Sequence, residues 1–418
     1  MRDPMTFEER LAATFDRLVA GAPVDDEPRH LALAAIETSA GGRHGSRSSL
    51  RIVWLAAAVV ALAGLLAMGL LAGRLRESPL PAIVASPAPS VSVPPAGPSA
   101  SPFPVLPGEP WIAYMSQVAG PGSDRLWLVR PDGSDRHQLA TGLDGQQEHP
   151  DWSPDGSRIL FDHWFTDPTR TGLDLLDDWV MNADGSAARR VAWCDSPCYQ
   201  LGYPSWAPDG GRFVVSRFDE LVGDAWGASA VEIVDLATGT RRVAWASADG
   251  SQAVHNPRWS PDGTRIVFTL ETYSDATEST LVSSVVAIVN ANGSSADPLV
   301  ITPAELGAGS PDWSPDGTRI AFHNRFDPGE AATRTTATDI WTVAPDGSGL
   351  TNVTNLGLGS QRAIEPTWTP DGSRLVFTLV DGFGGGQIPA VALMDADGSN
   401  VQRLGFASGT AGRLRPTR

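Results

Sequence analysis

The chain has 418 residues, 42% of them hydrophobic, and a formal net charge of -17. This length exceeds what one small hydrophobic core requires, so we expect more than one region. All 31 basic residues are arginines and they form no dense cluster, which argues against a nucleic-acid partner because phosphate binding requires clustered positive charge.

Residues 1–51 are expected to form a partly helical cytosolic tail. Thr6 and Glu9 match a capping box, in which the two side chains satisfy early backbone donors of a helix. Apolar residues then recur at helical spacing, namely Phe7, Leu11, Phe15 and Leu18. Two interpretations stay open for this tail: a short solvated segment beside a membrane, or a docking helix for a cytosolic partner.

A 21-residue uncharged segment follows, from Ile52 to Ala72, with the sequence IVWLAAAVVALAGLLAMGLLA. As a helix it would span about 31 Å, which matches a bilayer core of about 30 Å. It has no polar face, and it is too long and too far from the N-terminus for a cleaved signal peptide. We therefore predict a transmembrane signal anchor over residues 52–72.

More arginines precede this segment than follow it: Arg43, Arg47 and Arg51 against Arg74 and Arg76. By the positive-inside rule, the N-terminus is expected in the cytoplasm. Residues 78–110 then contain eleven prolines, a composition that favours extended polyproline II over a packed core. We predict a disordered Pro/Ser-rich stalk over residues 73–110 that reaches up to roughly 100 Å. The expected location is the cell membrane, with a single span and the C-terminal domain outside the cytoplasm.

From Trp111 onward the sequence is periodic. WSPDGTRI occurs twice, and close copies such as WAPDGGRF and WTPDGSRL place five tryptophans 54, 53, 54 and 55 residues apart. A near-constant period of this size indicates a repeat architecture. The residues assigned a structural role in the repeat are Trp152, Asp155, Gly156, Trp206, Asp209, Gly210, Trp259, Asp262, Gly263, Trp313, Asp316, Gly317, Trp368, Asp371 and Gly372.

Each copy contains the signals of four strands. A short strand ends in the tryptophan, a Pro-Asp-Gly turn of type I follows, and a β-branched strand such as RIVFTL comes next. After a variable loop, a third strand leads through a second turn to a short fourth strand. The tryptophan is expected to pack between neighbouring units, and the Asp and the Arg three residues later (Asp262 and Arg265, for example) are expected to brace the turn.

Four antiparallel strands per period are typical of a propeller blade. The part from the second to the fourth strand occurs six times, whereas the tryptophan strand occurs five times. The segment from Phe406 to Pro416 is positioned to supply the sixth. The predicted fold is therefore all-β: a six-bladed β-propeller of four-stranded antiparallel blades over residues 111–418, preceded by a single transmembrane helix and a short helical N-terminal tail.

The segment PDWSPDGTRIAF followed by IWTVAPDGSGLTNVT resembles the TolB-type propeller repeat. The resemblance covers about residues 111–405. It implies a location outside the cytoplasm, and it implies binding of other proteins or a role as an accessory domain of serine peptidases. The chain is similar to this family as a membrane-anchored member, with an anchor and a stalk where TolB itself has a cleaved signal and an additional domain.

The two cysteines, Cys194 and Cys198, lie in the sequence CDSPC. A small-loop disulfide in an oxidising compartment is the favoured interpretation. Free thiols and a metal site are the alternatives, the latter less favoured because a structural zinc site takes four ligands and no second Cys/His pair follows at finger spacing.

The sequence contains neither a Gly-x-Ser-x-Gly nucleophile elbow nor a His-Glu-x-x-His zinc motif. We therefore predict no catalytic residues, no cofactor and no metal. A ring of histidines and acids could still bind a metal, and the histidines considered for it are His149, His163, His255 and His323. Isolated surface histidines are the alternative.

The two short turns of every blade should lie on one face of the ring, and the long variable loops on the other. Loops on a rigid scaffold are the usual location of binding sites. The candidate residues for this long-loop face are His163, Asp177, Asp178, Asp219, Glu220, Asp224, Glu271, Asp275, His323 and Asp327. Solvated surface charge is the alternative interpretation of these acids.

The expected function is a non-catalytic module that binds an envelope or extracellular protein or ligand on the long-loop face. The membrane would be contacted through residues 52–72, and a cytosolic partner would bind residues 1–51. One alternative is a transmembrane regulator, because the layout resembles that of anti-sigma factors, although the tail has no cysteine for their zinc-binding motif. Another alternative is a propeller hydrolase or lyase.

Overall fold

The computed structural model describes the chain from residue 105 to residue 417 with internal gaps. The described ranges are 105–106, 108–117, 123–166, 174–195, 198–219, 227–248, 250–274, 280–324, 338–356, 361–381, 389–404 and 409–417. The predicted tail, the segment 52–72 and most of the predicted stalk lie outside these ranges. Within them, no helix has the length and apolar character needed to cross a membrane.

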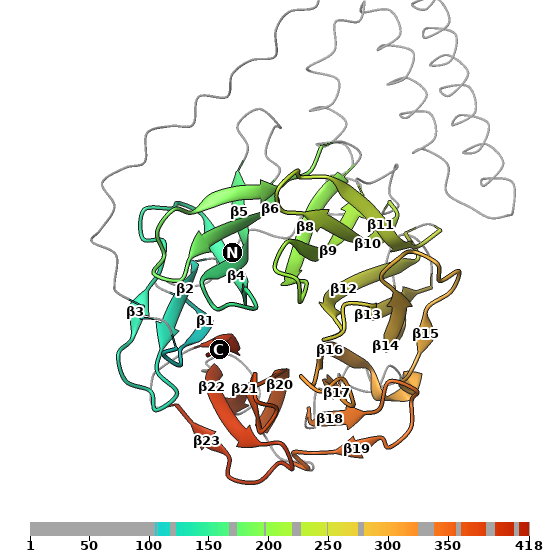
Figure 1. The fold of residues 1–418 in the computed structure, drawn as a ribbon. Coiled ribbons are helices and arrows are strands. Elements are labelled where there is room, and N and C mark those ends of the chain that lie inside the picture. Colours follow the sequence, from blue (N-terminus) through green and yellow to red (C-terminus); the bar gives the residue numbers. More distant parts are fainter. Residues whose placement is uncertain are drawn as a thin grey trace, which may run out of the picture. The chain divides into compact units, whose positions relative to one another are not determined.

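The described strands form antiparallel sheets that are arranged in a ring, with the first strand of each set nearest the centre (Figure 1). Three sheets have four strands in sequence order. They consist of β12 (Gln252–Trp259), β13 (Arg265–Tyr273), β14 (Leu281–Asn290) and β15 (Leu299–Val300); of β16 (Ala308–Trp313), β17 (Ile320–Asn324), β18 (Ile340–Val343) and β19 (Thr351–Asn352); and of β20 (Gln361–Trp368), β21 (Arg374–Asp381), β22 (Pro389–Asp395) and β23 (Gln402–Arg403).

An eight-stranded sheet contains two such sets. They are β4 (Gln146–Trp152), β5 (Arg158–Thr166), β6 (Asp174–Asn182) and β7 (Arg189–Ala192), followed by β8 (Cys198–Trp206), β9 (Arg212–Asp219), β10 (Ser229–Asp235) and β11 (Arg241–Ala246). The two sets are joined by a parallel contact between β6 and β8 at Leu176 and Gln200. Cys194, which follows β7, and Cys198, the first residue of β8, are joined as a disulfide.

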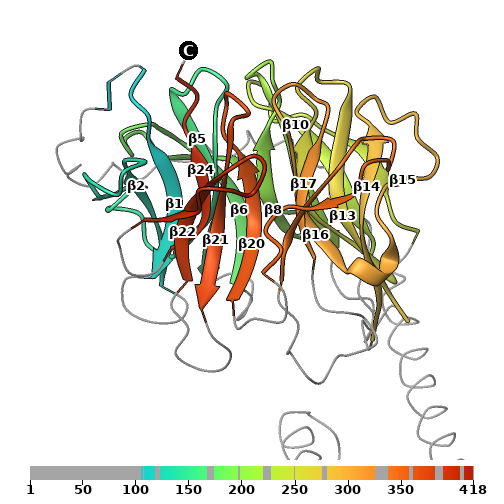
Figure 2. The same ribbon diagram turned by 90° about the horizontal axis from the view of Figure 1, so that it is seen from below.

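The remaining sheet joins the two ends of the described chain. It consists of β24 (Thr410–Leu414), β1 (Ile112–Gln117), β2 (Asp124–Val129) and β3 (His137–Gln138), in that order. The closure expected for the C-terminal segment is therefore present, because β24 pairs antiparallel with β1 and supplies the innermost strand. The strands run roughly along the axis of the ring (Figure 2). A single 3-10 turn, η1 (Ala304–Leu306), lies between β15 and β16.

Apolar side chains of neighbouring strand sets fill the space between them. Trp259, for example, shares a core with Val214 and Ile233 of the preceding set and with Phe268 of its own set. The other repeat tryptophans, Trp152, Trp206, Trp313 and Trp368, lie in equivalent cores. Each tryptophan is about 5–6% exposed, so large aromatic area is buried at each of these contacts.

The turn after each tryptophan is held by its aspartate. The Asp262 carboxylate accepts hydrogen bonds from the Ser260 hydroxyl (2.6 Å) and from the Thr264 N–H (3.0 Å). The expectation for the arginine is corrected in three hairpins, where Arg158, Arg265 and Arg319 stack on the tryptophan of the next set. Arg212 does both: it stacks on Trp259 and pairs with Asp209 of its own turn (2.7 Å). Guanidinium-to-ring distances are 4.9 Å for Arg265 over Trp313 and 4.7 Å for Arg319 over Trp368.

Candidate functional site

The strand nearest the centre of the ring carries an irregularity at the same place in each tryptophan repeat. The residue that precedes the proline before the tryptophan has a left-handed backbone, and the pairing register shifts there. These five residues, with their φ values, are His149 (47°), Tyr203 (57°), Asn256 (51°), Ser310 (50°) and Glu365 (56°). We call them the axial ring. Left-handed backbone is uncommon for residues other than glycine, so the surrounding structure must hold it.

Side chains of the preceding strand set hold this backbone. The N–H of Ser310 donates to the Thr269 hydroxyl (3.0 Å), and the N–H of Tyr203 donates to the Asp162 carboxylate (3.1 Å). In the same way, the N–H of Glu365 donates to Nδ1 of His323 (3.3 Å). One backbone conformation therefore recurs around the axis, while its side chains differ at every repeat.

A second set of residues lies two positions further along the same strands, and three of them are charged, Asp151, Arg258 and Asp312. Arg413 of β24 adds a fourth charged side chain to this set. Arg413 of β24 reaches Asp151 (Nε to Oδ1, 3.2 Å) and Asp312 (Nη1 to Oδ1, 3.3 Å). Each aspartate also accepts a backbone hydrogen bond of 2.8 Å, from Trp206 N–H and Trp368 N–H respectively. The carboxylates of Asp312 and Asp151 outweigh the effect of burial on Arg413 and raise its pKa.

Arg258 is the remaining charged residue of this set, and its surroundings differ. Its Nη1 donates only to backbone carbonyls, those of Pro204 (3.2 Å) and Pro257 (3.3 Å). No carboxylate of the described residues lies within 4.0 Å of its guanidinium. Burial, and then the charge of Arg413, lower the pKa of Arg258 to about 10, so the group is still a cation at neutral pH.

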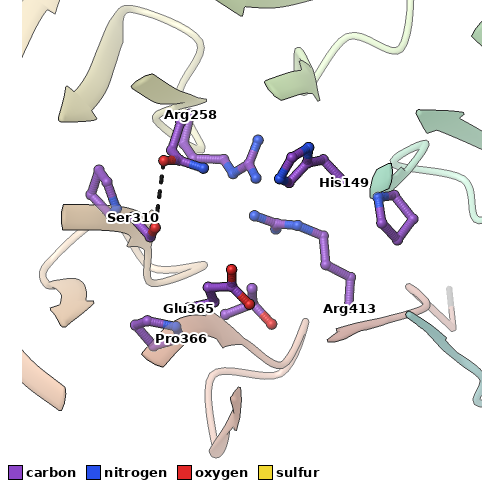
Figure 3. A pocket seen from close by; sticks show the side chains of 10 residues that line it. His149, Arg258, Ser310, Glu365, Pro366 and Arg413 are labelled. Carbon is purple, nitrogen blue, oxygen red and sulfur yellow. Dashed lines mark hydrogen bonds between the residues drawn. The ribbon is translucent and has the colours of Figure 1, made fainter. Parts of the chain in front are cut away.

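Two cavities lie on the axis and share Arg258 and Arg413 as lining residues. The inner cavity has a volume of about 30 Å³ and is lined by His149, Pro150, Asn256, Arg258, Ser310, Pro311, Glu365, Pro366, Thr367 and Arg413. Figure 3 shows the guanidinium groups of Arg258 and Arg413, the His149 ring and the Glu365 carboxylate converging on it. The outer cavity, of about 420 Å³, lies among the repeat tryptophans and the prolines of the following turns.

A buried pair of carboxyl groups lies behind His149. The imidazole Nδ1 lies 2.7 Å from Oδ2 of Asp162, and Asp162 faces Asp178 across β5 and β6. Both aspartates are fully buried, and the Asp178 carboxyl accepts no hydrogen bond from an N–H group or a hydroxyl in the described part of the chain. Burial, followed by the charges of Asp162 and Asp177, raises the pKa of Asp178 well above its usual range. Burial also lowers the pKa of His149, which favours the neutral imidazole.

The structure corrects the expected placement of the long-loop candidates. Six of them lie on strands: His163 on β5, Asp177 and Asp178 on β6, Asp219 on β9, Glu271 on β13 and His323 on β17. The strands extend further than expected because antiparallel pairing continues through these polar positions, as between β5 and β6 up to Thr166 and Asp174. The other four, Glu220, Asp224, Asp275 and Asp327, lie outside the described residues.

These six candidates are not gathered into one site. Asp177 is buried and ion-pairs with Arg190 (2.9 Å), and burial raises its pKa to about 6. His163 contacts the backbone carbonyl of Asp144, and Asp219 pairs with Arg217 (2.6 Å). Glu271 lies 3.5 Å from His255. His323 reaches the axial ring, where its Nδ1 accepts the backbone N–H of Glu365.

A shared histidine metal site is also not formed by the described residues. No group of three or more His, Cys, Asp or Glu side chains within the described ranges has an arrangement that could hold a metal ion. The axial residues Arg258, Glu365 and Arg413 were not singled out from the sequence. The signal that could have found Arg258 and Glu365 is the variation of the residues on either side of the proline in HPDW, YPSW, NPRW, SPDW and EPTW.

No family model matches the chain. Over 127 residues it is 29% identical to an uncharacterized protein of Agrobacterium fabrum, and this match covers 30% of the chain and 40% of that protein. Over 206 residues it is 28% identical to the uncharacterized peptidase YuxL of Bacillus subtilis, with 42% of the chain and 29% of that protein covered. The chain therefore spans less than half the length of these curated relatives.

Solved structures with a similar fold include TolB from Acinetobacter baumannii, with a TM-score of 0.52 and 15% identity over 73% of this chain and 66% of that one. Hydrazine synthase of Kuenenia stuttgartiensis matches with a TM-score of 0.55 and 12% identity over 74% of this chain and 47% of that one. At such low identities the likeness concerns the fold alone. It confirms the predicted all-β propeller fold.

Proposed function

We propose that this protein is a non-catalytic binding module that holds a protein or other ligand at the axial ring. The observation that carries the proposal is that five positions share one held backbone conformation and yet carry five different side chains, His149, Tyr203, Asn256, Ser310 and Glu365. The fold requires the backbone at these positions but not this particular variety of polar groups. A rigid scaffold with varied polar groups at a cavity is typical of a binding site.

We further propose that the ring has six blades. The eight-stranded sheet counts as two blades, because β6 and β8 share only the pair Leu176 and Gln200, whereas the strands within each half pair along most of their length. Residues 52–72 would anchor the propeller to the membrane and the stalk 73–110 would hold it outside the cytoplasm. The ligand is then a component of the envelope or the extracellular space.

Site-specific photocrosslinking tests the binding role. The protein is produced with the photoreactive amino acid p-benzoylphenylalanine in place of Tyr203, whose aromatic side chain it resembles. Crosslinking is carried out in the producing cells. The matched control carries p-benzoylphenylalanine in place of Trp193, which is 44% exposed and follows the outermost strand β7. We expect a discrete adduct from position 203 that position 193 does not give. Identical adducts from both positions, or none from position 203, would contradict the proposal.

A further inference from the structure

Arg258 is a buried cation whose charge is not matched by a direct ion pair. Its residue is 8% exposed, and its only hydrogen-bond acceptors among the described residues are the carbonyls of Pro204 and Pro257. Burying an ion without a paired counterion costs several kcal/mol. A native structure that keeps such a group at a cavity suggests that a counterion binds there.

Three carboxylates lie nearby and accept hydrogen bonds from other groups. Glu365, which lines the same cavity, accepts from the Thr378 hydroxyl (3.0 Å). Asp151 and Asp312 both pair with Arg413, and each also accepts a backbone N–H. Asp151 and Asp312 therefore attract Arg258 only through longer-range electrostatic interactions. The two arginines therefore differ: Arg413 has two carboxylates, and Arg258 has none in contact.

Unused hydrogen-bond donors are available beside the inner cavity. Within the described part of the chain, Nε and Nη2 of Arg258 have no acceptor, and Nδ2 of Asn256 has none either. Asn256 and Arg258 are two residues apart on β12, and both line the inner cavity. About 30 Å³ accommodates roughly two water-sized groups, which corresponds to the two oxygens of one carboxylate.

We propose that Arg258 and Asn256 bind a carboxylate group of the ligand in the inner cavity, while the rest of the ligand occupies the outer cavity of about 420 Å³. The planar fork of an arginine matches a carboxylate with two parallel hydrogen bonds. The negative charge of Glu365, which lines the same cavity, repels every anion, and it repels a multiply charged group such as phosphate more strongly than a carboxylate. This inference rests on the proposed function and names the chemistry of the ligand.

Thermal unfolding of the full-length protein tests the inference. Sodium acetate is titrated against sodium chloride at equal ionic strength and pH 7.5, because a ligand of the native state raises the unfolding midpoint in proportion to its occupancy. We expect a saturable rise with acetate. Arg258→Met should weaken acetate binding by about tenfold or more, as expected for the loss of charge-assisted hydrogen bonds. Arg258→Lys, which keeps the charge but lacks the planar guanidinium fork, should bind acetate with an affinity between those of the wild type and Arg258→Met.

The control variant is Arg189→Gln, which removes the same charge from an exposed position. Its acetate response should equal that of the wild type. Equal responses of the wild type and Arg258→Met would show binding of an adventitious ion only and would overturn the inference. If Arg258→Met does not fold, Arg258→Lys decides: weaker acetate binding than in the wild type supports the inference, and equal binding overturns it.

Two peptide arms distinguish the sources of the carboxylate. N-acetylated trialanine with a free C-terminus is compared with the same peptide carrying a C-terminal amide. If the free-acid peptide raises the unfolding midpoint more than acetate does, the natural ligand is a peptide terminus. If only acetate raises the midpoint, the natural ligand is a small carboxylic acid. If position 203 gives a crosslinked adduct but no carboxylate raises the unfolding midpoint, only this inference is overturned. If a carboxylate raises the midpoint but position 203 gives no adduct, only the proposed partner is contradicted.

Discussion

At the scale of single residues, an arginine of the hairpin turn contacts two neighbouring strand sets. It belongs to the turn of one hairpin, and its guanidinium stacks on the tryptophan of the next hairpin, as for Arg158 over Trp206 (4.7 Å). Arg415 after β24 completes this pattern over Trp152 (5.5 Å). Each such contact contributes about 0.5–2 kcal/mol, depending on how far it is desolvated. The repeat sequence therefore links the hairpins around the ring as well as forming each of them.

The buried carboxyl of Asp178 gives a prediction for pH and stability. Because its pKa in the folded protein is raised well above its usual range, mainly by burial, the native state keeps the proton that the unfolded chain releases above about pH 4. The stability associated with this group is therefore complete below about pH 4 and falls as the pH rises. Asp178→Asn should remove this loss and stabilise the protein at pH 7.5, by roughly 1–3 kcal/mol.

The measurement is the unfolding midpoint in urea for the wild type and Asp178→Asn between pH 4 and pH 8. The difference between the two should be small near pH 4 and should grow with pH. Asp184→Asn, which changes a half-buried aspartate in a turn, is the control. A constant difference at all pH values would contradict the prediction.

At the scale of elements, β24 closes the ring through both its backbone and one side chain. Its backbone pairs with β1, and Arg413 is the cation that compensates Asp151 and Asp312. Arg413→Met would leave two buried carboxylates without their partner, so we expect a loss of about 3–5 kcal/mol at pH 7.5. The loss should shrink at pH 4.5, because burial raises the pKa of Asp312 and its protonation removes one of the unpaired charges. Urea unfolding at the two pH values measures both effects.

Arg403→Met is the matched control for this prediction. Arg403 pairs with Asp381 at the surface, where both side chains are more than 40% exposed, so its removal should cost no more than about 1 kcal/mol. Equal losses of stability in Arg413→Met and Arg403→Met would show that the ion pairs of Arg413 stabilise the protein no more than a surface ion pair does. The triple variant R413M, D151N and D312N should recover much of the stability, since it leaves no unpaired charge.

The strand pattern and the closure could be predicted from the repeat, because tryptophan, Pro-Asp-Gly turns and β-branched residues act locally or between adjacent repeats. The axial site could not. Arg258 and Glu365 come from different strand sets, and their meeting at one cavity depends on how the ring closes. The acids around Asp177 were assigned to loops because charge is usual on exposed segments, whereas tertiary packing buries them on strands.

At the scale of the whole molecule, the predicted layout places the propeller outside the cytoplasm. We expect the full chain in the membrane fraction, and we expect protease added to intact cells with a permeable outer surface to digest residues 111–418 while residues 1–51 stay protected. Antibodies against tags at the two ends measure this directly. A variant without residues 52–72 should leave the membrane fraction. Protection of the propeller in intact cells together with its digestion after lysis would contradict the layout.

The sequence by itself determined the repeat, its four strands and the joining of the two ends, because these depend on short-range turn chemistry and on a pattern that recurs every 53 to 55 residues. Only the tertiary structure decided which residues meet on the axis. Closing the ring brings Asp151, Arg258, Asp312 and Arg413 together from segments up to 262 residues apart. Contacts between side chains that are so distant along the chain have no local signature, and they define the cavity where we place the ligand.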